Sequence, residues 1–295
     1  MSDKFDLPHE SQLAPQKLDL STEIKFKCHK GISCFNACCK RADVTLTPYD
    51  VIRMKEHFGM SSGDFLKAHT VPFEMDQQGM PGIKMRTDDE GACLFVTDEG
   101  CSIYEDRPTA CRYYPLGHMA IKEKDATEDA AAYFMISEEH CKGHEEDQVM
   151  TIAEFRKDQF IVDYDGYNRD WLDIQLKKRS SGPAVGNLPE ATLQLFFMAS
   201  YDMDRFRRFV MSDQFRATYD MKDSTYDILE KEDVALMQFG VRFMKQAFFG
   251  ERTIEEMSNA WEERVENRQE VWDMRREAEI ARKQAQDDEM YKSDD

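Results

Sequence analysis

Eight cysteines are the residues of this chain whose type and spacing could do chemistry. Four fall within twelve residues, and four thiols this close can converge on a soft metal without a long-range fold. Eight thiolates could fill two four-ligand sites, or one site with reactive thiols to spare. The pattern therefore predicts a cysteine-bound metal centre. The candidate ligands all precede residue 142: Cys28, Cys34, Cys38, Cys39, Cys93, Cys101, Cys111 and Cys141.

The alternative interpretation is that these cysteines are small buried hydrophobic residues or disulfide partners. Their clustering argues against it, because in a reducing cytosol grouped thiols are more often metal ligands or redox groups. Cys38 and Cys39 are adjacent, and neighbouring side chains tend to project in different directions, so one could bind one centre while the other binds a second centre or stays free. Four histidines near the cysteines are further candidate ligands: His29, His118, His140 and His144.

Basic residues surround the first four cysteines. Residues 21–41 carry five basic side chains against Glu23, a local charge of +4 in a chain of −19. Four thiolates on a divalent metal have a net charge of about −2, which nearby cations offset. Arg107 and Arg112 flank Cys111, and we expect them to pair with Glu105 and Asp106 rather than with cluster sulfurs.

The elements that must position these cysteines are short. Thr47 as N-cap, Pro48 and Gly59 predict a helix between them, and a second helix is expected from Ser61 or Ser62. Alternation and turn residues over 81–104 predict a hairpin-like β element with Cys93 and Cys101 at its edges. Ser102 and Glu105 resemble a helix capping box, and further short strands are expected near 116–122 and 131–137.

After Cys141 the pattern becomes helical. Apolar residues at helical spacing follow through 151–180, 191–212 and 231–250, and Thr253 with Glu256 predicts the start of a long charged helix. The sequence thus predicts an α+β fold, a small loop-rich metal-stabilised cysteine domain followed by a mostly helical region. The expected divisions are a flexible arm at 1–20, the cysteine domain at 21–148, the helical region at 149–250 with a connector at 180–189, and the charged helix and tail at 251–295.

Charge and hydropathy exclude several classes of function. With 39 Lys and Arg against 58 Asp and Glu, the chain would be repelled by phosphate backbones and anionic lipid. It also lacks an apolar run of about 18 residues and the basic-then-apolar order of a signal peptide. We therefore expect a soluble, cytoplasmic protein with no nucleic-acid or membrane partner. A protein partner or protein substrate stays open, as does the oligomeric state.

The cysteine-rich part resembles a known family. Cys28 to Cys39, then LTPYD, then CLFVTDEGCSIYEDRPTACRYYP are similar to the YkgJ-type cysteine-cluster family, a zinc- or iron-chelating domain with a CxxCxxCC signature. The resemblance covers about 24–145, although the first spacings, x5 and x3, are wider here. It implies metal or iron–sulfur binding, and the family includes a flagellin lysine methylase that uses S-adenosylmethionine.

The function predicted from these residues is the binding of an iron–sulfur cluster or other iron centre, in a redox or protein-modification role. One alternative is a structural zinc module that binds a partner protein. The other is an S-adenosylmethionine-dependent protein lysine methylase-like enzyme. No GxGxxG motif follows a strand, and no carboxylate pair identifies a general base, so the catalytic residues stay unassigned.

Overall fold

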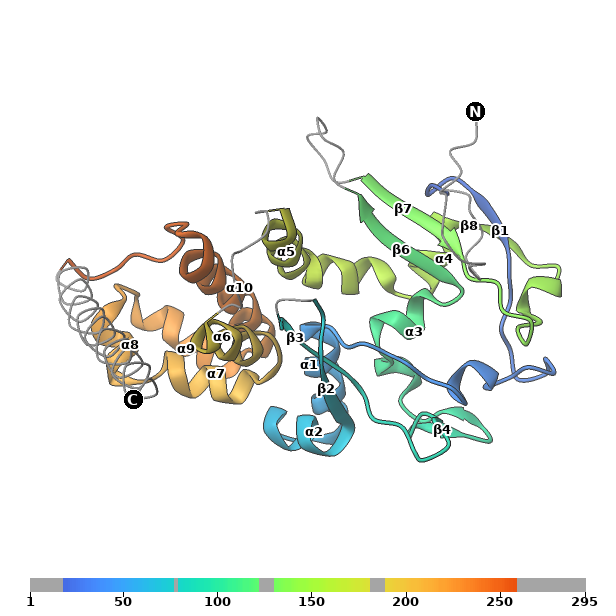
Figure 1. Cartoon of the computed structure of the whole chain (residues 1–295), viewed down its shortest axis with the longest axis horizontal. Helices are drawn as coiled ribbons and strands as arrows, with labels where there is room; N and C mark the ends of the chain where they lie inside the picture. The colour runs from blue at the N-terminus through green and yellow to red at the C-terminus, as the bar shows by residue number, and fades with distance from the viewer. Residues whose placement is uncertain (1–17, 77–78, 122–129, 181–188, 259–295) are drawn as a thin grey trace, which may run out of the picture.

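The computed structural model describes residues 18–76, 79–121, 130–180 and 189–258 (Figure 1). Of the predicted arm at 1–20, only the last three residues are described, and Leu18 pairs there with Tyr133. Most of the predicted connector and most of the predicted charged tail lie outside these ranges. The described residues confirm the α+β class with a helical C-terminal region.

The first half combines short strands with short helices. Its strands pair two by two and antiparallel within the described ranges: β1 with β8, β2 with β3, β4 with β5 and β6 with β7. The elements in chain order are β1 (Glu23–Lys25), η1 (Ala37–Cys39), α1 (Pro48–Phe58), α2 (Ser62–His69), β2 (Thr70–Glu74), β3 (Pro81–Met85), β4 (Val96–Thr97), β5 (Gly100–Cys101), η2 (Tyr104–Asp106), α3 (Thr109–Tyr113), β6 (Leu116–Ile121), β7 (Ala130–Met135), η3 (Gly143–Glu145) and β8 (Val149–Thr151).

Both ends of α1 lie where the sequence predicts them. Thr47 is the N-cap, and its hydroxyl accepts a hydrogen bond from the Asp50 amide at 3.2 Å. The Asp50 carboxylate accepts one from the Thr47 amide at 2.8 Å, which completes a capping box. Gly59 ends the helix with a φ of 59°, a conformation that favours glycine.

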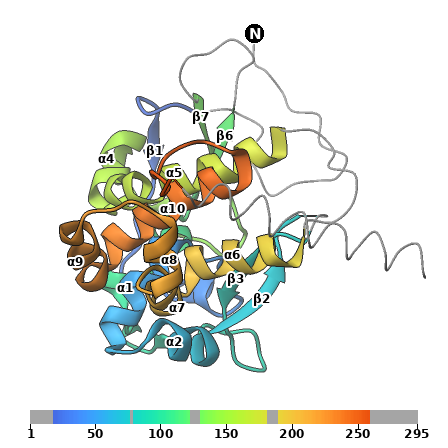
Figure 2. The same cartoon turned by 90° about the vertical axis from the view of Figure 1, so that its left-hand side faces the viewer.

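The second half is a group of helices that pack on one another (Figure 2). The helical pattern over 151–180 forms two helices, because Phe160 adopts a φ of 56° between them. The pattern over 191–212 also divides, because Asp202 caps a new helix by accepting from the Arg205 amide. The helices are α4 (Ile152–Asp158), α5 (Ile161–Ser180), α6 (Glu190–Tyr201), α7 (Met203–Val210), α8 (Asp213–Thr218), α9 (Asp223–Lys231) and α10 (Asp233–Phe249).

Two local predictions are wrong, and a third is confirmed in part. Within the hairpin-like element predicted over 81–104, β4 and β5 form a hairpin and Thr87 pairs with Cys93, whereas β3 pairs with β2 outside that range. Ser102 does not cap a helix; its hydroxyl donates to the Phe95 carbonyl at 3.1 Å. Thr253 opens no helix within 251–258, because its hydroxyl donates to the Arg242 carbonyl at 2.7 Å.

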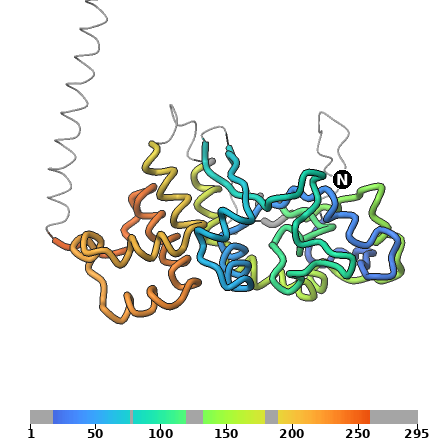
Figure 3. The backbone as a smooth tube through the Cα atoms, turned by 90° about the horizontal axis from the view of Figure 1, so that it is seen from below, coloured from blue at the N-terminus to red at the C-terminus, as the bar shows by residue number. Residues whose placement is uncertain are grey.

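A large hydrophobic core joins the two halves. It contains Val51 and Ile52 of α1, Ile83 of β3, Trp171 of α5 and Met244 of α10, each at most 4% exposed. Figure 3 shows α1 and α2 lying between the strand-containing end and the helical end of the molecule. None of the helices in the described residues is long and apolar enough to cross a membrane.

A smaller core lies beside strands β1, β6 and β7. Ile24 of β1, Tyr133 of β7, and Ile152 and Phe155 of α4 pack there, each at most 4% exposed. The β1–β8 pair closes this core by joining the start of the described chain to residues 149–151. Cys93 and Cys101 pack against the large core, and Cys141 packs against the smaller one.

Candidate metal centre

All eight cysteines carry free thiols in the structure. Cys28 and Cys38 are exposed and the other six are partly buried. They come from three stretches of chain: the loop around η1, the stretch from Cys93 through α3, and the turn at Cys141. Figure 1 shows the blue loop that follows β1 beside the hairpin of β4 and β5.

Cys28, Cys34 and Cys141 form a first group. Beyond the paired strands β1 and β8, the two chain segments stay side by side, and the Lys27 amide donates to the Gly143 carbonyl at 3.1 Å. The Lys142 amide then donates to the Cys34 Sγ, also at 3.1 Å. Burial, followed by the nearby thiols of Cys38, Cys34 and Cys141, raises the pKa of Cys28 to about 11.

Cys39, Cys93, Cys101 and Cys111 form a second group. The Cys93 amide donates to the Cys39 carbonyl at 2.8 Å, and Cys101 lies opposite Val96 in the β4–β5 pair. Burial raises the pKa of Cys111, and the nearby thiols of Cys93 and Cys101 raise it further. Burial is also the main cause of the raised pKa values of Cys93 and Cys101.

Cys38 lies between the two groups. Its Sγ is 3.9 Å from the Sγ of Cys39, and hydrogen bonding between the two thiols lowers the pKa of Cys38. The same hydrogen bond, then burial, raises the pKa of Cys39. The two adjacent thiols are thus in contact with each other, whereas the sequence suggests that they point in different directions.

The donor set fits a soft metal by type, since the thiols are free and thiolates suit zinc or iron. Their arrangement is open: among the described residues, no three His, Cys, Asp or Glu side chains already form a set that could hold a metal ion. Binding would therefore draw the sulfurs of a group together. The assignment of all eight cysteines as ligands stays a prediction.

The four candidate histidines each have other contacts. His118 lies between the rings of Tyr113 and Tyr133, with both ring centroids 5.4 Å away. His144 Nε2 lies 3.2 Å from the Ile136 carbonyl. The other two lie within ion-pair distance of carboxylates, His29 of Glu146 and His140 of Glu138. These contacts favour the cysteines as the donors of the site.

The two arginines around Cys111 have structural contacts, as expected, although their partners differ from those predicted. Arg107 donates to the Tyr104 carbonyl and to Gln159 Oε1, both at 2.6 Å. Arg112 is 1% exposed and donates mainly to carbonyl oxygens of the chain around it. Asp106 instead binds Arg53 and His57 of α1. The charged residues around Cys111 thus hold the chain in place.

Asp50 is a residue of this site that the sequence analysis did not single out. It is fully buried, and burial raises its pKa while hydrogen bonds from Thr47 and Thr109 oppose that rise. The Thr47-x-x-Asp50 spacing of the capping box was a signal for its contact with α1. Its contact with Thr109, two residues before Cys111, depends on the fold and has no local signal.

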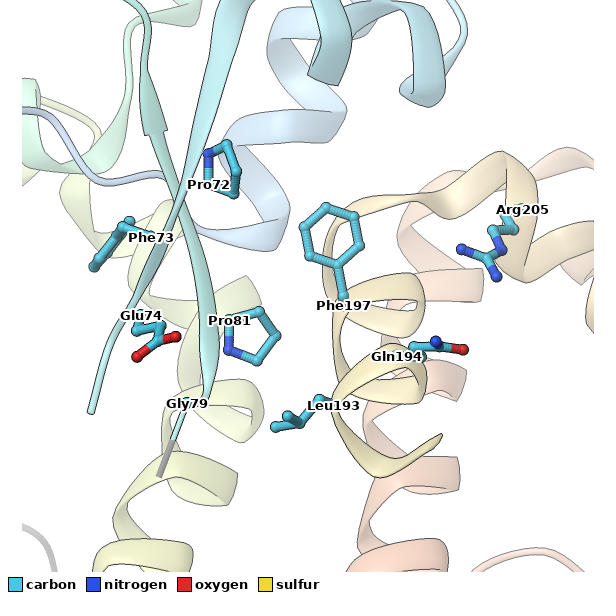
Figure 4. A pocket seen from close by; sticks show the side chains of 9 residues that line it. All are labelled: Pro72, Phe73, Glu74, Gly79, Pro81, Leu193, Gln194, Phe197 and Arg205. Carbon is cyan, nitrogen blue, oxygen red and sulfur yellow. The ribbon is translucent and has the colours of Figure 1, made fainter. Parts of the chain in front are cut away.

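A separate groove lies between the β2–β3 hairpin and α6. Figure 4 shows Pro72 and Pro81 of the hairpin facing Leu193 and Phe197 of α6. Its volume is about 470 Å³, and neither cysteine nor histidine lines it. The groove is therefore distinct from the candidate metal centre.

The structure joins a cysteine-rich region of short strands and helices to a helical region. Residues 27–142 match the family model described as "CxxCxxCC: Putative zinc- or iron-chelating domain". The match includes all eight cysteines and confirms the resemblance seen in the sequence. Searches of curated proteins and of solved structures returned no match to the chain. Metal binding of the zinc or iron class is thus the function that the family match supports.

Proposed function

We propose that this protein binds an iron–sulfur cluster through its cysteines and transfers single electrons. The observation that carries the proposal is that eight free thiols lie on three stretches of chain, which backbone hydrogen bonds bring side by side. Iron–sulfur clusters take four thiolate ligands, and their reduction potential depends on burial and on hydrogen bonds to sulfur. Free thiols on this scale suit a reducing compartment, which favours the cytoplasm.

Cys39, Cys93, Cys101 and Cys111 are the residues that would hold the cluster. These four cysteines are partly buried. Phe95 and Ile103, at 7% and 1% exposed, follow Cys93 and Cys101 by two residues each. Apolar neighbours exclude water from a cluster and so influence its potential. The bound cluster would supply one-electron chemistry, and these side chains would hold and shield it.

A structural zinc site is the second candidate, and the loop around η1 favours it. Between Cys28 and Thr45 the only buried side chain is Ile32, so this loop has little core of its own. A metal held by Cys28, Cys34 and Cys141, with Cys38 as the fourth thiolate, would replace the missing core, as in small zinc domains. Such a site would be colourless and inert to reduction.

Anaerobic purification followed by analysis of iron, sulfide and zinc tests the proposal. We expect a brown protein with iron and sulfide in equal amounts and absorption near ~400 nm. Cys111→Ser should lose that absorption, whereas Cys28→Ser, in the other group, should keep it. A colourless protein with zinc and no sulfide would exclude the iron–sulfur proposal and support the zinc site. Loss of colour in Cys28→Ser alone would overturn the choice of ligands.

A further inference from the structure

The Asp50 carboxylate accepts hydrogen bonds from two segments that are far apart in the sequence. Its carboxylate is fully buried, and its two oxygens have separate partners. Oδ2 accepts from the Thr47 amide at 2.8 Å, at the start of α1. Oδ1 accepts from the Thr109 amide at 2.8 Å and from the Thr109 hydroxyl at 2.7 Å, at the start of α3. One side chain thus caps two helices.

The start of α3 needs such an external acceptor. This helix has only five residues, Thr109 to Tyr113, and its N-cap is Pro108, which makes no side-chain capping bond. The first amides of a helix have no partner within the helix, and a negative charge near them is favourable. Asp50 supplies both the acceptor and the charge.

Cys111 is therefore fixed through Asp50. It lies two residues after Thr109 and directly before Arg112, whose guanidinium binds the Arg107 and Gln159 carbonyls at 3.0 Å each. The helix turn that carries Cys111 is held on one side by Asp50 and on the other by Arg112. The thiols of Cys93 and Cys101 lie close enough to Cys111 to raise its pKa, so the turn sets where the Cys111 thiol lies relative to them.

We propose that Asp50 is a positioning residue of the metal centre, which orients Cys111 through its hydrogen bonds to Thr109. The inference rests on the proposed function, because it concerns a ligand of the same site. It assigns to Asp50 a role beyond the capping of α1. It also predicts that asparagine cannot fully replace aspartate at this position.

Asparagine has one oxygen where aspartate has two. In Asp50→Asn the amide can take two orientations. If its oxygen faces Thr47, its nitrogen faces the donors of Thr109 and those bonds are lost. If its oxygen faces Thr109, the bond from the Thr47 amide is lost. The variant can therefore cap one helix but not both. Thr109→Val breaks only the hydroxyl bond to Asp50, and Thr109→Ser keeps it. Thr47→Ala weakens the cap of α1 without touching α3, and so serves as the matched control.

The test measures alkylation of individual cysteines by iodoacetamide in the metal-free full-length protein, with peptide mass spectrometry as the readout. In Asp50→Asn we expect Cys111 to react up to about tenfold faster relative to Cys93, the ratio for a lost hydrogen bond to a charged group. Loss of the Asp50 charge near the Cys111 thiol also speeds alkylation, so Thr109→Val, which keeps that charge, decides whether positioning contributes. Thr109→Val should show a smaller increase, while Thr109→Ser and Thr47→Ala should keep the wild-type ratio. Iron and sulfide content after reconstitution should fall in the same order.

Two results would overturn the inference. First, if alkylation of Cys111 and of Cys93 is accelerated equally in Asp50→Asn, the variant loosens the fold in general. Second, if Thr47→Ala changes the alkylation ratio as much as Thr109→Val, the effect comes from the cap of α1. If Asp50→Asn fails to fold, the Thr109 variants decide. A wild-type protein without iron and sulfide would contradict the proposed cluster, yet the Cys111 to Cys93 ratio would still test Asp50.

Discussion

Arg112 shows at the scale of one residue how the site is held. It is almost fully buried, yet its guanidinium binds the carbonyls of Arg107, Gln159 and Glu105 and the hydroxyl of Tyr164. It also lies 4.1 Å from the centre of the Tyr164 ring. A guanidinium spreads five donors over a planar fork, whereas an ammonium group carries three donors on one atom and cannot reach all four of these acceptors. Arg112 therefore joins α3 to η2 and to the turn between α4 and α5.

Arg112→Lys should destabilise the protein by about 2–4 kcal/mol, because several buried acceptors would lose their donors. Urea unfolding followed by circular dichroism measures the change in the free energy of unfolding. Arg216→Lys is the matched control, since Arg216 lies 3.8 Å from the Tyr226 ring centre but is exposed. It should change stability by less than about 0.5 kcal/mol. Similar values for both variants would contradict the role given to Arg112.

At the scale of elements, the sequence predicts what local chemistry decides. The α1 helix begins and ends as expected because Thr47, Pro48 and Gly59 each act within one turn. Ser102 has the spacing of a capping box, but its hydroxyl binds a carbonyl across the β4–β5 hairpin. The break in the long helix at Phe160 has no local signal, since a positive φ at phenylalanine depends on tertiary packing.

For the candidate site, too, the sequence predicts what is local and misses what depends on the fold. The clustering of cysteines in the sequence predicts metal binding, which the family match supports. Their division into two groups follows from the fold, because the β1–β8 pair and the Lys27 to Gly143 hydrogen bond bring Cys141 beside the loop of Cys28 and Cys34. Pairing between residues more than a hundred positions apart leaves no periodic signal in the sequence.

Gly143 allows that close approach of the two segments. A Cβ atom at this position would lie 2.4 Å from a ring carbon of Phe26 and 3.1 Å from the Lys27 carbonyl oxygen. Gly143→Ala should therefore displace Phe26, which is 6% exposed, and cost about 1–3 kcal/mol of stability. Gly143→Ala should also lower the amount of metal bound by Cys28, Cys34 and Cys141. The metal content of the group that contains Cys111 should not change. The control is Gly63→Ala, where no atom lies within 4 Å of the added carbon.

At the scale of the whole molecule, the helical region and the cysteine-rich region share one interior. The large core contains residues between Leu46 and Ile103 together with residues between Trp171 and Ile254. An ion-pair cluster crosses the same boundary, because Lys55 of α1, only 8% exposed, lies 2.6 Å from Asp233 of α10. Arg207 and Asp204 of α7 complete this cluster. Unfolding one region would expose buried apolar and charged groups of the other.

Calorimetry of the metal-loaded and chelator-treated protein should therefore show one transition in each case. A ligand that binds only the folded state stabilises all of a cooperative unit, so metal removal should lower the midpoint of the whole transition by roughly 10 °C. Cys111→Ser, which should lack the metal of the buried group, serves as the control, and chelator should move its midpoint less. Two transitions, of which only one responds to chelator, would contradict this expectation. They would mean that the cysteine domain and the helical region unfold independently, divided near residue 148 as the sequence predicts.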